Sequence, residues 1–566
     1  MTSASSAAML SSSLNHLAET WNGAASYGTS GEALTDLFSQ TSRGLSRTRL
    51  LALLDRAWQS DHLLTMRLIA YVRQVRGGKG ERDLGRWSLD WLAEHSPRDL
   101  LHNLKHYVDT FGRWGDLVCL TTYASVRKGV FALVAKQLRA DADALDRGER
   151  SISLAAKWVP SEGKKVGEVY GFNRQLAQHM DLSRKELRQL LTRLRKALDL
   201  VETHLAKGTL YQVDYSKTPS VAMNCHGKQG KAFERRDGDR FAAYKAALTK
   251  GEAKVNTSAL FPHQVVEKYL AFSDYGVAAG GPDELTEAQW RSVLERLTPK
   301  ERGHLGETLT VVDTSGSMYC GEYGGKTTTK PITVALTLGL LVTEVNPNPA
   351  FNDLVLTFDE HPEFHRITGT SLHERVASLA GSRWGRSTNF EATFRLILSK
   401  ALEYEFSPAD MPKTLLVISD MQFNSAGDLT NYQALRAAYE EAGYKVPRLV
   451  FWNVDGSTTD FPVTASQVDT AMVSGFSIEI LRDVLKGEDI TPFKVMMRTL
   501  ERDDYQVITL APPPAAVAFV EATSVGVAEA AADPSTRETG SGEEGDDLPE
   551  PKRAEGESPL VLQVVS

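Results

Sequence analysis

Hydrophobic positions recur at intervals of three and four residues through the first half of the chain. Residues 46–59, for example, align Leu50, Leu54 and Ala57 in one stripe. Such a stripe covers one face of an α-helix and must be buried against neighbouring helices. Short segments with Gly or Pro interrupt the pattern, so we predict successive helix pairs from about residue 31 to residue 300. The expected fold of this half is an α-helical, HEAT-like solenoid or ring.

Residues 183–200 give the clearest helix signal in this half. Ser183 and Glu186 have the spacing of a capping box, in which each side chain bonds the backbone N–H of the other residue. Leu187, Leu191 and their neighbours then follow on one side, so a helix is predicted to begin directly after Ser183.

From about Leu305 the period changes, because short apolar runs of strand length now alternate with helical segments. Strands alternating with helices predict a parallel sheet covered on both faces, the α/β doubly wound fold, over residues 305–510. The predicted strands are 308–313, 354–359, 414–420 and 448–455, and a helix at 492–503 and a short strand at 505–510 close the domain.

The composition fits a globular protein of at least two domains, since 566 residues exceed what one hydrophobic core supports. No run of about 18 apolar residues is present, so no membrane segment is expected. The first thirty residues lack Lys and Arg, unlike a secretory signal. We therefore expect a cytoplasmic protein with a disordered lead (1–30) and a disordered acidic tail (511–566).

The net charge of −8 conceals two different halves. Residues 41–300 hold 43 Lys and Arg against 30 Asp and Glu, which gives +13, whereas residues 301–566 hold 21 against 39, which gives −18. A positive half can bind a polyanion, although a solvated helical surface also carries many Lys and Arg. Nucleic-acid binding and a solvated surface both remain open on this basis.

The segment "LTVVDTSGSMYCG" (309–321) ends an apolar strand in a cluster of oxygen atoms. It fits a capped turn, a catalytic nucleophile or a site for a hard cation. Catalysis by Cys320 is disfavoured because no His is near it in the sequence. The three cysteines of the chain are far apart, which argues against a disulfide framework and a zinc site.

The cation interpretation gains weight from the later strands. In an open parallel sheet, ligands bind beyond the carboxyl ends of the strands. Asp313, with Ser315 and Ser317 at alternate positions after it, lies there. Thr388 precedes a predicted helix, and Asp420 ends another predicted strand. Magnesium prefers such oxygen ligands, but only several loops together can supply enough of them.

Three segments, "VVDTSGSM", "GRSTNF" and "VISDMQF", resemble the loops of a von Willebrand factor A domain with its metal-ion-dependent adhesion site (MIDAS). The resemblance implies a divalent cation, with magnesium expected and manganese or calcium as alternatives. It also implies one coordination position for an acidic group of a protein partner. The residues expected to hold the metal, directly or through water, are Asp313, Ser315, Ser317, Thr388 and Asp420.

The first half resembles a TROVE-like family that is distantly related to the Ro autoantigens. The segments that carry this resemblance are "GKGERDLGRW" (78–87), "FGRWGDL" (111–117), "LAAKWVPSEG" (154–163), "VDYSKTPSVAM" (213–223) and "KGEAKVNTSALFPHQVV" (250–266). In Ro proteins a ring of helical repeats binds single-stranded RNA ends in its hole and structured small RNAs on its outer surface. The resemblance therefore implies a ribonucleoprotein.

Basic side chains near aromatic ones are the candidates for RNA contact, because cations hold phosphates and aromatic rings stack on unpaired bases. For each group the alternative is a solvated helix face. The predicted RNA-binding residues are Arg73, Arg76, Lys79, Arg82, Arg86, Lys157, Lys164, Lys165, Lys217, Lys228, Lys231, Arg235 and Arg236.

The leading hypothesis is a monomeric, non-enzymatic scaffold. Its helical half binds single-stranded or small structured RNA, and its α/β half binds a divalent cation and a protein partner. The rival is a metal-dependent protein–protein adhesion module without RNA. A hydrolase is disfavoured, because no G-x-S-x-G surrounds Ser317 and Asp313 lacks a second Asp two residues later.

Overall fold

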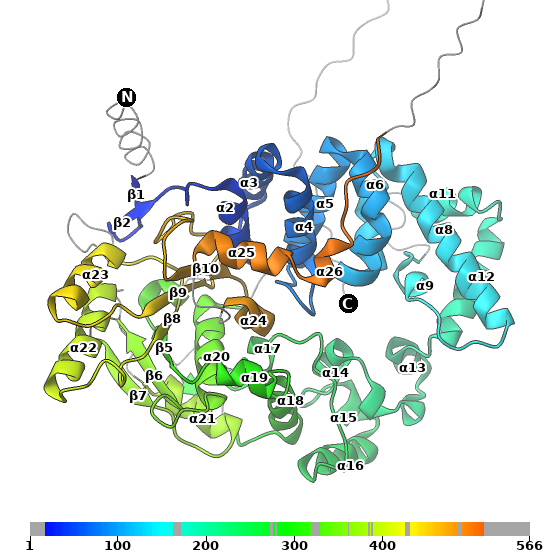
Figure 1. Cartoon of the computed structure of the whole chain (residues 1–566). Helices are drawn as coiled ribbons and strands as arrows, with labels where there is room; N and C mark the ends of the chain where they lie inside the picture. Colours follow the sequence, from blue (N-terminus) through cyan, green and yellow to red (C-terminus); the bar gives the residue numbers. More distant parts are fainter. Residues whose placement is uncertain are drawn as a thin grey trace, which may run out of the picture.

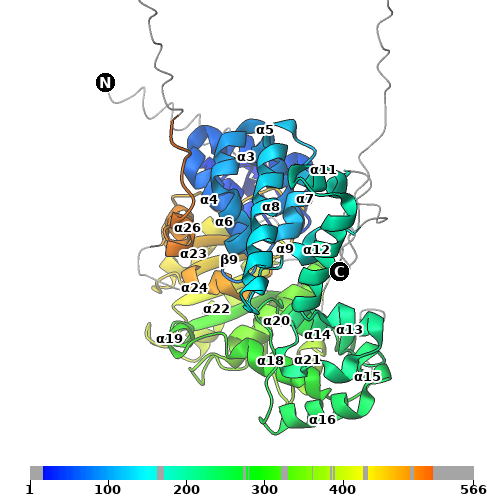
Figure 2. The same cartoon turned by 90° about the vertical axis from the view of Figure 1, so that its right-hand side faces the viewer.

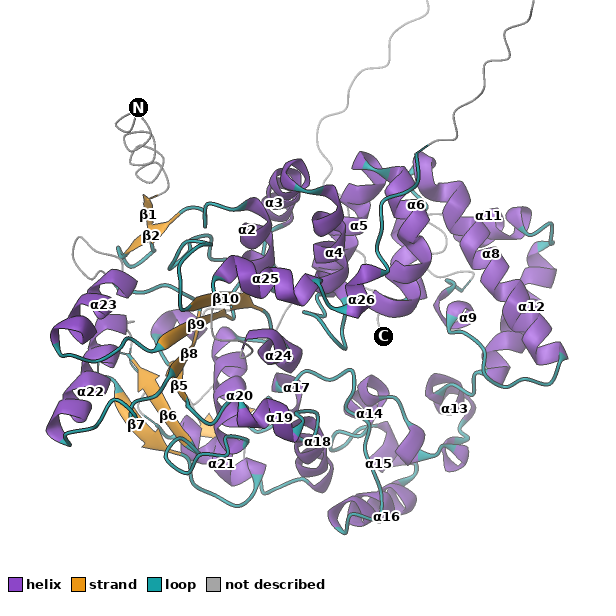
Figure 3. Ribbon diagram, in the orientation of Figure 1, coloured by secondary structure: helices purple, strands orange, loops and turns teal. Residues whose placement is uncertain are grey.

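The chain divides into a helical first half and a second half built on a mixed sheet (Figures 1 and 3). The change of period near residue 305 is therefore confirmed as a change of architecture. None of the described helices is long and apolar enough to cross a membrane. The computed structural model describes residues 17–161, 171–271, 276–277, 280–319, 329–359, 361–382, 385, 389–424, 431–484 and 490–513.

Helices of the first half begin where the sequence supplies capping side chains. The Ser46 hydroxyl accepts the Arg49 N–H, and the predicted capping box of Ser183 and Glu186 is confirmed. These bonds satisfy N–H groups that have no partner within the helix. The elements are α2 (Ala33–Gln40), α3 (Arg47–Ser60), α4 (His62–Arg73), α5 (Arg82–His95), α6 (Pro97–His106), η1 (Tyr107–Phe111), η2 (Trp114–Asp116), α7 (Leu117–Leu120), α8 (Ala124–Asp146), α9 (Ala155–Trp158), α11 (Phe172–His179) and α12 (Arg184–Ala197).

The remaining helices of this half turn back toward the sheet (Figure 1). Several of them enclose a small core of their own, which contains Met223, Phe233 and Phe241. The elements are α13 (Val201–Lys207), η3 (Leu210–Gln212), η4 (Tyr215–Lys217), α14 (Ser220–His226), α15 (Ala232–Arg236), α16 (Gly238–Thr249), α17 (His263–Val266), β3 (Leu270–Ala271), β4 (Gly276–Val277), α18 (Glu284–Leu294) and α19 (Pro299–Gly303).

The sheet of the second half has the strand order β10-β9-β8-β5-β6-β7, and only β7 is antiparallel to its neighbour. A predominantly parallel sheet with intervening helices is what the alternating pattern predicted. The elements are β5 (Thr308–Asp313), η5 (Gly316–Tyr319), α20 (Pro331–Glu344), β6 (Leu354–Phe358), β7 (Glu363–Arg366), α21 (Leu372–Ala380), α22 (Phe390–Glu403), β8 (Thr414–Ser419), α23 (Asn431–Glu441), β9 (Arg448–Asn453), β10 (Thr470–Ser474), η6 (Ile478–Ile480), α24 (Leu481–Val484), α25 (Pro492–Leu500) and α26 (Asp503–Gln506).

Helices cover both faces of this sheet, as the strands β5, β8 and β10, which are buried throughout, require. In β5, Val312 packs into the core shared with α20, α21 and α25, whereas Val311 packs into the core shared with α22 and α23. The first of these cores continues without a break into the helices of the first half. The two halves are therefore joined by a common hydrophobic interior.

Residues 17–30 form a hairpin on the second half, contrary to the prediction that residues 1–30 are a disordered lead. Its strands are β1 (Leu17–Glu19) and β2 (Ala25–Tyr27). Tyr27 and Phe461 exchange backbone hydrogen bonds of 3.0 and 2.8 Å. Such a short segment has no hydrophobic period, so the sequence pattern gave no signal for it. Residues 1–16 lie outside the described residues.

The predicted strand at residues 505–510 is wrong. These residues form the end of α26 and an extended segment that runs along α6, where Asn103 donates to the Thr509 carbonyl (2.7 Å) and accepts from its N–H (3.1 Å). The Tyr505 ring is fully buried and stacks on Phe111. Tyr505 and Ile508 are thus buried against the helices, whereas Val507 and Leu510 are exposed. Residues 514–566, most of the predicted acidic tail, lie outside the described residues.

The beginning and the end of the helical half meet at the α/β half. The Arg43 guanidinium lies over the rings of Phe261 and Phe476, 5.7 and 4.6 Å from their centroids. Arg296 forms an ion pair of 2.7 Å with Glu479 beside this contact. Figures 1 and 2 show the helices leading from the sheet through α8 and α12 and back to it. The helical half is therefore closed into a ring by its contacts with the α/β half.

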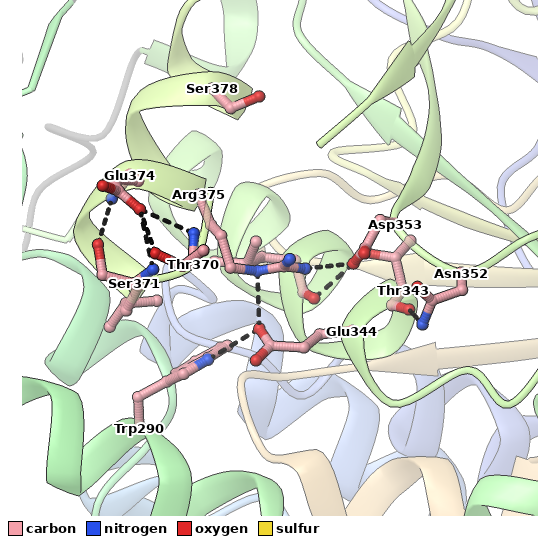
Figure 4. A network of polar contacts seen from close by, with 12 residues as sticks. Trp290, Thr343, Glu344, Asn352, Asp353, Thr370, Ser371, Glu374, Arg375 and Ser378 are labelled. Atoms are coloured by element: carbon pink, nitrogen blue, oxygen red, sulfur yellow. Dashed lines mark hydrogen bonds and ion pairs between the residues drawn. The ribbon is translucent and has the colours of Figure 1, made fainter. Parts of the chain in front are cut away.

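A polar network fixes the returning helices to the sheet domain (Figure 4). Glu344 of α20 accepts hydrogen bonds from the Trp290 indole of α18 (3.0 Å) and from Arg375 of α21 (3.1 Å). Arg375 also pairs with Asp353. Glu287 of α18 accepts the backbone N–H of Leu372 (2.8 Å) at the start of α21. A carboxylate of one half thus caps a helix of the other.

Candidate divalent-cation site

The predicted oxygen cluster lies where two neighbouring strands of the sheet end. Asp313 is the last residue of β5, and Asp420 directly follows β8. From β5 the chain continues to β6 on one side and later returns to β8 on the other. This reversal of strand order opens a crevice at the carboxyl ends, which is the usual ligand position in such sheets.

The Asp313 carboxylate is fully buried and held by two hydrogen bonds. Its Oδ1 accepts the backbone N–H of Ser315 (2.9 Å), and its Oδ2 accepts the hydroxyl of Ser419 (2.6 Å). Each carboxylate oxygen has a second lone pair, so both remain able to bind a cation. The carboxylate is therefore oriented before any ligand arrives.

Two hydroxyls stand beside this carboxylate. Ser315 Oγ and Ser317 Oγ are 3.2 Å apart, and Ser317 also bonds Asp420. Adjacent oxygens in an octahedral magnesium shell are about 3.0 Å apart when each lies about 2.1 Å from the metal. The spacing of the two hydroxyls is thus close to that of neighbouring ligands, and the donor set contains only oxygen.

Burial makes the charged forms of both carboxyls unfavourable. It raises the pKa of Asp313 well above the usual carboxyl range, and the charge of Asp420 adds to the rise. Burial also raises the pKa of Asp420, with hydrogen bonds from Ser317 and the Gln422 N–H acting against it. A bound cation would favour the charged forms, so the residues fit a divalent metal.

Thr388, the fifth predicted ligand, lies outside the described residues. Its described neighbours are close to the end of β6, because a side chain at Gly385 would collide with the carboxylate of Asp359. The Phe390 ring packs edge-on against Phe358, with ring centroids 6.3 Å apart. The loop that carries Thr388 therefore begins and ends beside a strand adjacent to β5.

Several polar residues at this edge were not predicted from the sequence. Ser419 positions Asp313, and Asp455 and Asp460 raise the pKa of Asp420. Met421 adopts a left-handed backbone (φ 66°), which is uncommon for a residue with a side chain. The position of Ser419 directly before Asp420 was the one available signal. Among the described residues, no group of three His, Cys, Asp or Glu side chains is arranged for a metal.

The structure contradicts part of the first predicted RNA-binding group. Lys79 is fully buried, and its ammonium contacts Thr41 and Ser474. Arg73 is also buried and pairs with Asp116 (2.7 Å), which binds Arg86 as well (2.8 Å). These cations stabilise the fold, because a buried charge needs a partner or hydrogen bonds.

Arg76 and Arg82 of the same group are exposed, and Arg82 pairs with Asp83 (3.1 Å). In the second group, Lys157 pairs with Glu202 (2.9 Å), while Lys164 and Lys165 lie outside the described residues.

The third group lies on the helices around α14 and α15. Lys217 pairs with Asp214 (3.1 Å), Lys228 approaches Glu267 (3.9 Å), and Arg236 donates to the Leu205 carbonyl (2.8 Å). Lys231 and Arg235 are exposed. Most of the predicted RNA-binding cations in the described chain thus already have protein partners.

Comparison with known proteins yields two family matches. Residues 20–128 and 169–305 match the family model described as "Domain of unknown function (DUF2828)". Residues 307–511 match the one described as "Domain of unknown function (DUF7788)". The boundary between the two matches coincides with the start of the sheet domain.

Among solved structures, the chain is similar to "Crystal structure of Deinococcus radiodurans RO (RSR) protein". The two share 17% identity at a TM-score of 0.34, with 81% of this chain and 91% of that chain covered. We draw neither geometry nor function from a similarity of this size.

A curated relative spans nearly the whole chain. It is "Uncharacterized protein L728" of Acanthamoeba polyphaga mimivirus, which is 30% identical over 522 residues, covering 86% of this chain and 87% of the relative. In this chain the DUF2828 match precedes the DUF7788 match. The chain belongs to the family of this mimivirus protein.

Proposed function

We propose that this chain is a non-enzymatic RNA-binding scaffold whose α/β half binds a divalent cation and, through it, a protein partner. The observation that carries the proposal is the division of the molecule. A basic helical ring is closed by an acidic α/β half, and an oxygen-only cluster lies at the edge of the sheet in that second half. The positive half suits RNA as its ligand, and the negative half suits a divalent cation.

The cation part rests on Asp313, Ser315, Ser317 and Asp420, which the fold brings together from two loops. Their pattern resembles the adhesion site of von Willebrand factor A domains, with Thr388 as the remaining ligand. Magnesium suits the expected near-octahedral set, while manganese and calcium are the alternatives. In this proposal an acidic side chain of the partner completes the coordination.

The RNA part rests on the positive charge of residues 41–300 and on the segments that resemble Ro-related proteins. A ring of helices with an excess of Lys and Arg attracts the phosphate backbone without reading a sequence. Structured RNA or single-stranded ends are the proposed ligands.

A metal-dependent adhesion module without RNA binding is the second candidate. The specific observation in its favour is that three of the predicted RNA-binding cations bind protein groups instead. They are Arg73, Lys79 and Arg86. The two candidates differ in what the helical half does and share the cation site.

Filter binding of the full chain to a single-stranded RNA and to an RNA hairpin distinguishes them. RNA binding that weakens steeply between about 50 and 200 mM salt supports the scaffold. Absence of binding at low salt, or binding that does not respond to salt, overturns the RNA part. Sequencing of nucleic acid that copurifies with the protein would then identify the natural ligand.

A further inference from the structure

We propose that the amino-terminal hairpin positions Asp420 for the divalent cation, with Gln422 as the link between them. This inference rests on the proposed cation site and extends it to residues that were not among its predicted ligands. The hairpin (β1 and β2, dark blue in Figure 1) contacts the loop after β8, although 401 positions separate Trp21 from Gln422 in the chain.

Gln422 uses all four of its polar groups. Its backbone N–H donates to Asp420 Oδ1 (3.1 Å), and its backbone carbonyl accepts from the Asn22 side-chain amide (2.7 Å). Its side-chain oxygen accepts the Trp21 N–H (2.6 Å), and its side-chain nitrogen donates to Asp460 (3.2 Å). Only one orientation of this amide satisfies both partners, because one donates and the other accepts. The residue that holds a carboxylate oxygen of Asp420 is therefore itself fixed by the hairpin.

Two further contacts join the hairpin to the same loop. The buried Thr20 hydroxyl donates to the Phe423 carbonyl (2.7 Å) and accepts the Ala24 N–H (2.9 Å). Gly23 and Asn424 form an antiparallel bridge. The hairpin thus holds three successive residues of the loop after β8.

The loop needs this support because its backbone turns sharply. Met421 adopts a left-handed conformation (φ 66°), which costs free energy for a residue with a side chain. Its N–H donates to Ser419 Oγ (2.9 Å), and the Ser419 hydroxyl donates to Asp313 Oδ2 (2.6 Å). The turn at Met421 therefore lies between the groups that orient the two carboxylates. A shift of this turn would move Asp420 away from Asp313 and from the Ser317 hydroxyl that bonds it.

Thr20, Asn22 and Gln422 are positioning residues in this proposal, since their polar groups bond the protein. Groups that orient metal ligands affect the affinity for the metal, because a cation binds best where its ligands already stand in place. Loss of the hairpin contacts should therefore weaken cation binding even where the fold persists.

The test is a titration of the full chain with Mn²⁺, which accepts the same oxygen ligands as Mg²⁺. The electron paramagnetic resonance signal of the free ion measures binding, and Asp313→Asn defines the background. The variant Thr20→Val, Asn22→Ala removes two side-chain hydrogen bonds to the loop and no charge. We expect its dissociation constant for Mn²⁺ to rise about tenfold.

Two controls separate positioning from a general loss of stability. Trp21→Ala alters the same turn but keeps the backbone N–H, and its side chain is exposed, so it should bind Mn²⁺ like the wild type. Thr20→Ser keeps the hydroxyl and should also bind like the wild type, whereas Thr20→Val alone should bind more weakly. If the double variant is unfolded at the temperature of the titration, Asn22→Ala, at an exposed residue, replaces it.

The outcomes that contradict the proposal are distinct. Asp313-dependent binding of equal affinity in the wild type and the double variant overturns the role of the hairpin and leaves the cation site in place. Equal weakening by Trp21→Ala overturns that role as well. A wild-type chain that binds no more Mn²⁺ than Asp313→Asn overturns the proposed cation site and the role of the hairpin with it.

Discussion

The ammonium group of Lys79 lies 2.7 Å from the hydroxyl oxygen of Ser474, at the end of β10. It also contacts the Thr41 carbonyl and hydroxyl, each at 2.9 Å, and the Phe38 carbonyl. One buried lysine thus ties the loop after α4 to both α2 and the sheet. This contact is one of the points at which the α/β half closes the ring.

The first prediction concerns the pH dependence of this contact. Burial lowers the pKa of Lys79 well below its ordinary value of 10.5, so the unfolded chain binds the proton more strongly than the folded chain. The free energy of unfolding should therefore increase, through Lys79, as the pH rises toward that ordinary value. Urea titrations between about pH 7 and 10 should show a steeper rise for the wild type than for Lys79→Met. Thr41→Val removes a contact of Lys79 but no titrating group, so its free energy of unfolding should rise with pH as steeply as that of the wild type. Equal pH dependence of the wild type and both variants would contradict the prediction.

The second prediction tests the cation site by thermal unfolding. Magnesium that binds only the folded chain should stabilise it by about 2.7 kcal/mol at a hundredfold excess over the dissociation constant. Magnesium should therefore raise the Tm of the wild type but not that of Asp313→Asn, because the substitution replaces a negatively charged oxygen ligand with a neutral amide. Asp141→Asn is the control, since Asp141 is also a buried carboxyl but lies on α8 in the helical half. The cation site is refuted if Asp313→Asn responds like the wild type.

A third prediction concerns Asp116, which receives three arginine contacts in the helical half. Arg73 donates at 2.7 Å, Arg86 at 2.8 Å and the Arg113 backbone N–H at 3.2 Å. Asp116→Ala would leave the Arg73 charge buried without its partner and should destabilise the fold by about 3–5 kcal/mol. Chemical denaturation measures the loss. Asp83→Ala removes the exposed pair with Arg82 and should cost about 1 kcal/mol or less.

The fourth prediction concerns the amino-terminal hairpin. Ala24 is 1% exposed and packs in the core on the α22–α23 side of the sheet. Ala24→Asp should lower the Tm by several degrees, because it buries a charge without a partner. Trp21 lies in the same turn but is 93% exposed, so Trp21→Ala should leave the Tm unchanged. Equal effects of the two substitutions would show that the hairpin does not pack on the sheet domain.

Much of the candidate cation site was predictable, because its key residues sit at positions that the strand pattern defines. Asp313 ends one apolar strand and Asp420 directly follows another, and the carboxyl ends of parallel strands share one edge. Ser419 was missed because it lies within a strand pattern, and its position directly before Asp420 was the one signal that could have found it. Metal binding itself stays a prediction, as does the role of Thr388.

The sequence by itself determined the helical character of the first half, the strands β5, β6, β8 and β9, and the residues at the ends of those strands. Each of these follows from local periodicity, capping or spacing, which act over a few residues. Only the tertiary structure decided which cations face solvent. Arg73 and Lys79 look like surface charges in the sequence, yet both are buried against partners 38 or more positions away. A charge becomes structural when distant polar groups surround it, and the ring closure that brings those groups together leaves no periodic trace in the chain.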